Sequence, residues 1–531
     1  MRQFHLALCL AAVAALLASP IAAQIRLQPV GTYATGLFDA SAAEIAAYDP
    51  EKKRLFSTNT GGASVDAIDI SNPAAPRLLF AISVLPYGLQ PNGVAVRQGV
   101  VAAAVQNQVK TDPGSVVFFD TEGRFLKSVT VGALPDMLTF TPDGRKVLVA
   151  NEGEPNSLYT IDPEGSVSII DISGGIPNLT QDRVTTAHFR AFTRSNIDSK
   201  IRIYGPNATV AQDLEPEYIT VSADSRLAFV TLEENNAIGV LDINAGAFTR
   251  LMALGFKDHR LAGNALDASD MDGGINITTW PVFGMYQPDT IASYTFAGST
   301  FLVTGNEGDE RDYAGFSENV RVRNQRLDPT AFPNAASLQL DSALGRLTVT
   351  KALGDTDGDG DYDQLFVPGG RSFSIWTERG ELVFDSGDQL ERIIAQANPA
   401  EFNSDFDRNG SFDQRSDNRG PEPEGVAVGQ VGDRTYAFIG IERMGGVMAY
   451  DITNPFLARF VQYVNNRNFA GNPRDGTAGD LGPEGVLFIR AEDSPDGRPL
   501  VVLSNEVSGT VTIYAVTPAP PLPPRGRRAG P

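Results

Sequence analysis

The sequence predicts an all-β fold, a seven-bladed β-propeller with long inter-strand insertions, on three observations. A weak internal repeat of short alternating strands runs through most of the 531 residues. Glycine and proline, at 52 and 34 residues, reach the level that is typical of proteins rich in β-turns. The long amphipathic helices that a parallel α/β sheet needs between its strands are missing.

The repeat unit begins with a proline or small residue and an acid or amide, followed by two short strands. Asn or Glu ends the second strand, and a third strand ends in Asp-Ile or a similar pair. The clearest copies begin at Pro135-Asp136, Pro216-Glu217, Pro423-Glu424 and Pro483-Glu484. Alternating Val, Ile, Phe and Tyr with Asp-Gly or Asp-Ser turns is the pattern of an antiparallel β-meander.

Three weaker copies begin near Glu44, Pro91-Asn92 and Pro288-Asp289, which makes seven units. In the last of these, the outer strands are delayed to the segments near residues 372 to 386. Sheets that cannot bury both faces alone must stack, and radial closure of seven copies gives a propeller, here expected over residues 30–515. Long insertions are expected at 173–213, 244–287, 308–370 and 387–420, and loops of this length often carry functional sites.

The chain ends predict export. A positive Arg2, an apolar run from Leu6 to Ala18 and small residues before Gln24 predict a signal peptide over residues 1–23. The run is shorter than the roughly 20 apolar residues that span a bilayer, so no membrane span is expected. Residues 516–531, rich in Pro and Arg, are expected to be a disordered tail. We therefore expect a soluble periplasmic or extracellular protein.

Composition excludes several functions. The net charge of −21 disfavours nucleic acid as a partner and favours cations. The one cysteine, Cys9, lies in the leader, and only His188 and His259 of the three histidines follow it. These counts disfavour cysteine catalysis and histidine-rich metal sites, so oxygen ligands must carry the chemistry.

The repeat also predicts a ring of polar groups at one rim of the propeller. The loop before the innermost strand and the loop after the second strand share a rim, which gathers Glu44, Asn92, Asp136, Glu217, Asp289, Glu424 and Glu484 with Asn59, Asn107, Glu152, Glu234, Glu307, Glu442 and Glu506. One interpretation is a funnel that binds cations or substrate. The other is that these groups cap strand ends and bond backbone amides between blades.

Two loops have the alternating carboxylates of calcium-binding loops. The sharper one carries Asp355, Asp357, Asp359, Asp361 and Asp363, although Phe366 stands where an EF-hand has its bidentate Glu. A looser copy carries Asp405, Asp407, Asn409 and Asp413. A third cluster comprises Asp267, Asp270 and Asp272. Calcium at these sites is expected to brace the long insertions, with a soluble acidic turn as the alternative for the first loop.

A few isolated residues are candidates for catalysis. His259 is interpreted as a solvated loop histidine in preference to a general base. Arg311, Arg371 and Arg443 fit either an anion clamp or structural ion pairs. The sequence contains no G-x-S-x-G elbow, P-loop or H-E-x-x-H motif.

As a group, several segments resemble the choice-of-anchor I family of exported bacterial propellers, which is related to mesenchyme-type surface glycoproteins. They include ANEGEPN, LEPEYITVSAD, TLEENNAIGVLDI, PVFGMYQPDTIASY, TGNEGDERDYAGFSE, GDTDGDGDYDQL and GPEPEGVAVG. The resemblance runs from about residue 30 to 515 and implies a seven-bladed propeller outside the cell, usually with a variable C-terminal anchor. The short tail here departs from that pattern. Similar proteins are sometimes labelled alkaline phosphatases, and some are fused to nucleotidase domains.

Two functions remain open. The first is a calcium-binding propeller that recognises a small molecule or a surface or matrix ligand through an acidic channel mouth, without chemistry of its own. The second is a metal-dependent phosphoesterase, in which Ca²⁺ or another divalent metal polarises the phosphate and activates water. Its candidate residues hold the metal or clamp the phosphate: Glu152, Glu217, Glu307, Arg311, Glu424, Arg443 and Glu484.

Overall fold

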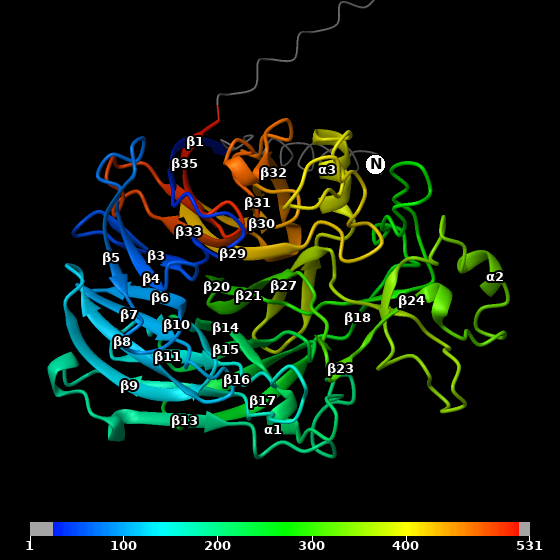
Figure 1. Cartoon of the computed structure of the whole chain (residues 1–531), viewed down its shortest axis with the longest axis horizontal. Coiled ribbons are helices and arrows are strands. Elements are labelled where there is room, and N and C mark those ends of the chain that lie inside the picture. Colours follow the sequence, from blue (N-terminus) through cyan, green and yellow to red (C-terminus); the bar gives the residue numbers. More distant parts are fainter. Residues whose placement is uncertain (1–24, 520–531) are drawn as a thin grey trace, which may run out of the picture.

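The computed structural model describes residues 25–519 and consists mainly of four-stranded antiparallel sheets arranged in a ring (Figure 1). The described residues form seven such sheets, which we call blades 1 to 7 in chain order. The predicted signal peptide and the end of the predicted tail lie outside the described residues.

Each of the first four blades is built from consecutive strands. Their strands are, in blade 1, β2 (Ala46–Asp49), β3 (Arg54–Asn59), β4 (Ser64–Asp69) and β5 (Arg77–Ser83); in blade 2, β6 (Pro91–Arg97), β7 (Val100–Val105), β8 (Pro113–Asp120) and β9 (Phe125–Ala133); in blade 3, β10 (Pro135–Phe140), β11 (Lys146–Asn151), β12 (Ser166–Asp171) and β13 (Val184–His188); and in blade 4, β14 (Pro216–Val221), β15 (Leu227–Leu232), β16 (Ala237–Asp242) and β17 (Ala247–Ala253).

The last three blades draw on more distant segments. Their strands are, in blade 5, β20 (Ile291–Phe296), β21 (Ser299–Asn306), β27 (Ser372–Thr377) and β28 (Leu382–Asp385); in blade 6, β29 (Pro423–Val431), β30 (Arg434–Ile441), β31 (Val447–Asp451) and β32 (Arg459–Val464); and in blade 7, β33 (Pro483–Ile489), β34 (Leu500–Asn505), β35 (Thr510–Pro518) and β1 (Ile25–Ala34). The delayed outer strands predicted for the fifth unit are β27 and β28.

The ring closes on itself. The innermost strand of each blade contacts that of the next, in the order β2, β6, β10, β14, β20, β29 and β33, and β33 contacts β2 again. Seven buried hydrophobic clusters fill the seven interfaces between neighbouring blades. Because a single sheet leaves both faces exposed, this stacking supplies the core of the molecule. The predicted all-β propeller is confirmed.

The first and last strands of the chain seal the ring. β1 pairs antiparallel with β35, so that Ile25 lies opposite Pro518 and Leu27 opposite Val516. The propeller therefore covers more of the sequence than the predicted residues 30–515. Residues 516–518 belong to a strand and not to a disordered tail. Pairing between opposite ends of a chain leaves no local pattern in the sequence, which explains the error.

The insertions form smaller elements around the ring (Figure 1). Their strands are β18 (Phe256–Asp258), β19 (Phe283–Met285) and β26 (Phe366–Val367) in one sheet, β22 (Asp312–Tyr313) with β23 (Phe316–Ser317), and β24 (Asn319–Arg321) with β25 (Thr348–Thr350). The short helices are α1 (Val210–Asp213), α2 (Ala335–Leu338) and α3 (Gln389–Ala397). In Figure 1, α2 and β24 lie at the right, α3 at the top and α1 at the bottom. The 3₁₀ turns are η1 (Ile176–Asn178), η2 (Gln181–Arg183), η3 (Val322–Asn324), η4 (Pro455–Leu457) and η5 (Pro473–Asp475).

Candidate functional site

The acids of the repeat lie where the innermost strand begins and the second strand ends. In blade 3, Pro135 pairs with Asn151, and Asp136 and Glu152 follow these two residues directly. In blade 6, Pro423 pairs with Ile441 in the same way. Because antiparallel pairing places the start of one strand beside the end of its partner, the two sets of polar residues share one end of each blade.

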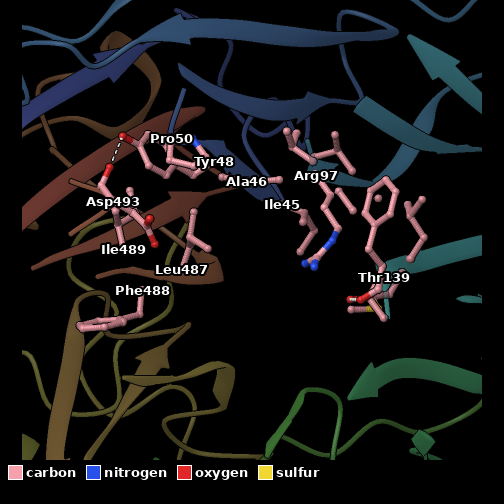
Figure 2. Close-up of a pocket in the computed structure, with 18 of the residues that line it drawn as sticks. Ile45, Ala46, Tyr48, Pro50, Arg97, Thr139, Leu487, Phe488, Ile489 and Asp493 are labelled. Carbon is pink, nitrogen blue, oxygen red and sulfur yellow. Dashed lines mark hydrogen bonds between the residues drawn. The ribbon is translucent and has the colours of Figure 1, made fainter. Parts of the chain in front are cut away.

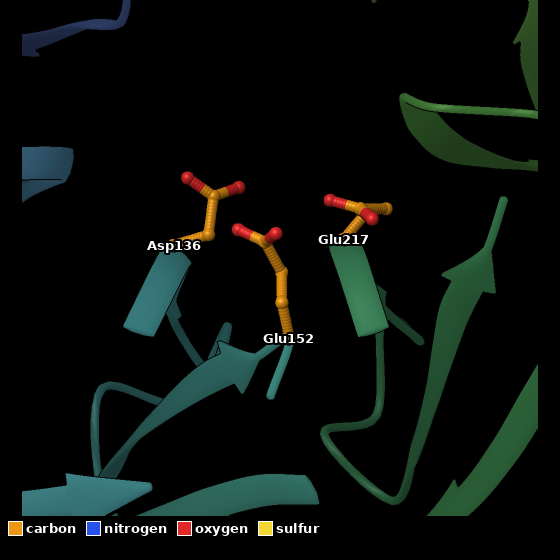
Figure 3. A group of neighbouring side chains, drawn as sticks. All are labelled: Asp136, Glu152 and Glu217. Carbon is orange, nitrogen blue, oxygen red and sulfur yellow. The ribbon is translucent and has the colours of Figure 1, made fainter. Parts of the chain in front are cut away.

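Three acids from blades 3 and 4 form the first carboxylate group, which we call site A. In Asp136, Glu152 and Glu217, carboxylate oxygens lie within 4.8 Å of one another. Figure 3 shows the three carboxylates gathered above the ends of their strands. All three side chains are partly accessible, so an ion from solvent can reach them.

A second group, site B, joins blades 5, 6 and 7. It consists of Asp289, Glu424 and Glu484, whose carboxylate oxygens also lie within 4.8 Å of one another. Glu424 is buried, while the other two are partly accessible. Residues more than 190 positions apart in the sequence thus meet because each occupies the same place in its own blade.

The acids of sites A and B are strongly perturbed. Burial, then the Asp289 carboxylate, raises the pKa of Asp136 to about 7. Burial, together with neighbouring carboxylates, also holds the pKa of Glu152, Glu217, Glu424 and Glu484 well above the ordinary value. Within residues 25–519, no Lys or Arg nitrogen lies within 4.0 Å of these acids. Lys110, which pairs with Glu154, offsets the charge of Glu152 only in part, and the rest of this charge is left without a counterion among the described residues.

A third carboxylate group, site C, differs from the other two in having arginine partners. Glu307, Glu422 and Glu442 approach one another within 4.8 Å. Arg443 Nη2 lies 2.8 Å from Glu422 Oε2, and Arg419 Nη1 lies 3.1 Å from Glu307 Oε1. Burial raises the pKa of Glu422, but the guanidinium groups of Arg419, Arg443 and Arg415 together hold it well below the ordinary value. Arginines therefore supply the counterions of Glu422, whereas burial still raises the pKa of Glu307 to about 8 and that of Glu442 well above the ordinary value.

The amide members of the predicted ring, and two of its acids, make local hydrogen bonds. Asn92 Nδ2 donates to the Pro135 carbonyl in the next blade at 3.1 Å, and Asn107 Nδ2 donates to the Pro113 carbonyl at 2.9 Å. Asn59 Oδ1 accepts from the backbone of Gly62 at 2.8 Å. Glu44 accepts from Thr60 Oγ1 at 2.9 Å, and Glu506 accepts from Ser41 Oγ at 3.0 Å. These contacts fit the interpretation that the polar groups of the ring cap strand ends and hold neighbouring segments by hydrogen bonds.

Arg311, one of the two candidate phosphate clamps, is fully buried. Its guanidinium forms ion pairs with Asp213 and with Glu215, the latter at 2.8 Å, and it also donates to the Asp213 carbonyl. Glu234 of the predicted ring lies in the same buried region, where burial raises its pKa and Arg311 lowers it. Arg311 thus holds an insertion against blade 4, and its cationic side chain does not face solvent.

Arg371 is also buried and structural in its contacts. Nη1 lies 2.7 Å from Glu391 Oε1 and 2.7 Å from the Asp267 carbonyl, and Nη2 donates to the carbonyls of Ser416 and Asn418.

The prediction that His259 is a solvated loop histidine is wrong. His259 is only 1% exposed, its Nδ1 lies 2.6 Å from the Asn264 carbonyl, and burial lowers its pKa well below the ordinary value. Packing against distant chain segments caused the burial.

The first calcium-type loop has an ordered hydrogen-bonding pattern. Asp355 accepts from the backbone of Gly358 at 2.7 Å and of Gly360 at 3.1 Å, so the loop wraps around this carboxylate. Asp361 and Asp363 lie within 4.8 Å of Asp328, which the sequence did not single out. Asp357 and Asp359 accept only from nearby backbone amides and are exposed.

The second loop is divided between two environments. Asp405 lies 3.1 Å from Arg408 and 3.8 Å from Arg443, while Asn409 donates to the Gly471 carbonyl. Asp407 lies 3.8 Å from Arg408.

Asp413, the last acid of that loop, instead joins Asp267 and Asp272 from the third predicted cluster, within 4.8 Å. Asp270, the remaining acid of this cluster, pairs with Arg346. A contact between two insertions far apart in sequence produces this rearrangement, which the spacing within one loop could not indicate.

Comparisons with known proteins confirm the family that the sequence resembles. The sequence profile of the choice-of-anchor I domain matches residues 44–455. Gigasin-3a of Magallana gigas is 31% identical over 191 residues, which are 34% of this chain and 67% of the relative. The mesenchyme-specific cell surface glycoprotein of Strongylocentrotus purpuratus is 30% identical over 285 residues, 47% of this chain but only 36% of the relative. The chain thus spans about a third of the second relative.

Two solved structures align over most of the chain at low identity. Hydrazine synthase of Kuenenia stuttgartiensis aligns with a TM-score of 0.46 and 15% identity, over 91% of this chain and 98% of that chain. Streptogramin B lyase aligns with a TM-score of 0.44 and 11% identity, over 93% and 98%. Within residues 25–519, no helix is long and apolar enough to cross a bilayer.

Proposed function

Because the chain belongs to the choice-of-anchor I family, we propose that it is an exported β-propeller that works in binding or recognition at or outside the cell surface. Ca²⁺ is its principal cation, and sites A and B form an acidic channel mouth. A small molecule or a surface or matrix component is the proposed ligand. The name of the Strongylocentrotus relative, a cell surface glycoprotein, supports this location.

The observation that carries the proposal is the uncompensated charge of sites A and B. Two unit charges about 4.8 Å apart repel by roughly 3–4 kcal/mol at an effective dielectric constant of about 20. Six acids in two groups, with neither Lys nor Arg close by among residues 25–519, are therefore costly when they are ionised. A bound divalent cation removes this cost, whereas in site C the arginines already do so for Glu422.

The spacing suits calcium. Ca²⁺–oxygen distances are about 2.3–2.6 Å, so two oxygens on opposite sides of the ion lie about 4.6–5.2 Å apart. The oxygens of site A, and those of site B, lie within 4.8 Å of one another, which is compatible with such an ion. Mg²⁺ demands near-ideal octahedral geometry and keeps several waters, whereas Ca²⁺ accepts irregular sets of carboxylates, and for that reason we favour calcium.

Calcium in the loop of Asp355, Asp357, Asp359, Asp361 and Asp363 is a separate part of the proposal. Three of these side chains are exposed and all are acceptors, and Asp328 adds a further carboxylate beside Asp361 and Asp363. An ion there would tie the insertion between β25 and β26 to the segment that carries Asp328, in a protein whose only cysteine lies in the leader.

Calcium titration by calorimetry, with bound metal counted by mass spectrometry, tests the channel mouth. Glu217→Gln in site A and Glu424→Gln in site B should each remove one ion or weaken its binding at least tenfold. Glu122→Gln is the matched control, because Glu122 pairs with Arg54 at 3.1 Å on an exposed turn. Unchanged calcium binding in both site variants, with the fold intact by circular dichroism, would overturn the proposal.

The phosphoesterase alternative is tested in the same preparation. Hydrolysis of a phosphomonoester is measured with Ca²⁺ and with chelator, over a range of pH. No turnover under any condition is expected if the propeller only binds. Turnover that requires metal and disappears in Glu217→Gln and Glu424→Gln would replace the binding proposal with the phosphoesterase. Arg311 is unsuited to clamp phosphate there, because its guanidinium is already occupied by two carboxylates.

A further inference from the structure

A cavity of about 410 Å³ lies along the innermost strands, beyond the carboxylates (Figure 2). β2, β6, β10 and β33 supply most of its wall, and Tyr218 of β14 completes it. The lining begins next to the acids, at Ile45 and Met137, and extends to the opposite ends of the strands, at Arg97 and Arg490. Its volume lies in the range of small-molecule pockets, about 300–1,000 Å³.

Apolar residues are the more numerous in the wall, while polar atoms supply nearly as much of its surface. Met137 of β10 and Leu487 and Phe488 of β33 are partly accessible and line the cavity, together with the buried Val94 of β6. Small residues such as Ala46 leave the space between them open. An apolar body that fills this space gains the favourable free energy of leaving water.

The two ends of the cavity have opposite polarity. Tyr218 follows Glu217 of site A directly in β14 and lines the cavity at the acidic end. Burial, followed by the Asp289, Asp136 and Glu484 carboxylates, raises the pKa of its hydroxyl. Arg97 stands at the other end. It donates from Nη2 to the Pro142 carbonyl at 2.6 Å, and its Nε is buried with no acceptor.

Arg97 also lacks a counterion. Among residues 25–519, no carboxylate oxygen lies within 4.0 Å of its guanidinium, although the chain has a net charge of −21. Arg490, at the same end, is instead paired with Asp493 at 2.6 Å. Figure 2 shows Arg97 and Asp493 on opposite sides of the cavity. One guanidinium at this end is thus left to meet a ligand.

We propose that this cavity binds an apolar monocarboxylate, with its carboxylate on Arg97 and its hydrocarbon or aromatic part extending toward Tyr218. Where sites A and B hold no cation, the acids near Tyr218 repel the carboxylate, and Arg97 attracts it to the other end in either state, which sets the direction of the ligand. A guanidinium also matches phosphate in geometry, but Arg97 is one cation whose Nη2 already donates to a carbonyl, so it balances one negative charge better than two. The site is separate from sites A and B and does not require their cations.

Octanoate and benzoate are suitable probes, and octanol is the uncharged control. Binding to the full-length secreted protein is measured by calorimetry and by saturation-transfer NMR in the presence of chelator. We expect one molecule of octanoate per chain and at least tenfold weaker binding of octanol. Binding that disappears when chelator removes Ca²⁺ would mean that the carboxylate binds a metal ion, and it would overturn the proposal.

Two variants and one control locate the site. Arg97→Gln should weaken octanoate binding at least tenfold, and Ala46→Leu, which fills the cavity, should do the same without altering any charge. Arg124→Gln should bind as the unaltered protein does, because Arg124 is exposed and pairs with Asp120 on an outer turn. Circular dichroism checks that each variant is folded. Failure of both carboxylates to bind the unaltered protein, or unchanged binding in Ala46→Leu, would exclude this site.

Discussion

Arg443 Nη2 lies 2.8 Å from Glu422 Oε2, and this pair separates site C from the two other carboxylate groups of the ring. The same guanidinium lies 3.3 Å from Glu442, and its plane covers the Phe406 ring at 4.0 Å. Site C has arginine counterions, whereas sites A and B have none within 4.0 Å among residues 25–519. The arginines gather around Glu422, which lies two residues before the repeat acid Glu424, so the acid added outside the repeat is the one that they pair with.

Arg443→Gln should lower the stability of the protein, because it leaves the buried Glu422 with less positive charge around it. We expect a loss of roughly 3 kcal/mol in the free energy of unfolding at pH 7, as is usual when one partner of a buried pair is removed. Urea denaturation measures this loss. The difference should shrink below about pH 4, where Glu422 becomes protonated in the unfolded chain. A loss that stays constant down to pH 3 would contradict the role assigned to the pair.

Stability without metal should decrease between pH 5 and pH 8. Burial, with neighbouring carboxylates, raises the pKa of Glu44 to about 8 and that of Asp136 to about 7. The folded protein then binds more protons than the unfolded chain across this interval, so the free energy of unfolding falls as pH rises. Calcium should raise Tm more at pH 8 than at pH 5, since it must compete with these protons at the lower pH.

Thermal unfolding followed by circular dichroism, in chelator and in excess Ca²⁺, checks this dependence. Mg²⁺ at the same ionic strength is the control for general screening, and its effect should be smaller. A Tm that stays level or rises from pH 5 to pH 8 in chelator would show that these acids ionise without cost in the folded protein.

The sequence was sufficient for the ring because each blade repeats a local pattern. The start of β14 at Pro216 and the end of β15 before Glu233-Glu234 follow directly from alternation and turn residues. Even the insertion between β21 and β27 did not hide blade 5, because its outer strands keep their alternating residues. Radial symmetry then converts local positions into spatial neighbours, which is how Asp289 and Glu484 could be predicted to meet.

Contacts between insertions had no such symmetry to reveal them. Glu422 lies two residues before the repeat acid Glu424, in the same Pro-Glu-Pro-Glu run, and it was not predicted as a site residue. Alternation alone does not show that the arginines gather around Glu422. Asp413 meets Asp267 across about 146 positions, and neither loop records the other in its spacing. The burial of His259 arises within one insertion, because its backbone bonds to Val282 and Trp280, more than 20 positions further along the chain.

Arg311→Gln should destabilise the fold and should not act on a ligand. The substitution leaves Asp213 and Glu215 as buried carboxylates without their partner, which costs about 3–5 kcal/mol. Arg323→Gln is the control, because its pair with Asp341 is exposed and is worth about 0–1 kcal/mol. Urea denaturation distinguishes the two. If Arg311→Gln were as stable as the unaltered protein, the buried network would not hold the insertion in place.

Asp355→Asn should remove one bound Ca²⁺ while it keeps the shape of the loop. The asparagine retains an oxygen that accepts from Gly358, but it loses the charge that attracts the cation. In calcium, the variant should be cut by a protease within residues 355–363 at least several times faster than the unaltered protein. Asp112→Asn, on an exposed turn, is the control. Equal metal content and equal cleavage rates would indicate that the loop is only an acidic turn.

Leu27→Ala should weaken the closure of the ring, because Leu27 is 2% exposed and packs in the cluster between blades 6 and 7. Its backbone amide also bonds to Gln462 Oε1 of β32 at 2.9 Å, so β1 is tied to both blades. Removing a buried leucine side chain costs about 2–5 kcal/mol. Arg26→Ala, on the exposed face of the same strand, should cost less than about 0.5 kcal/mol. Equal urea midpoints for the two variants would mean that β1, the strand from the other end of the chain, does not stabilise the interface between blades 6 and 7.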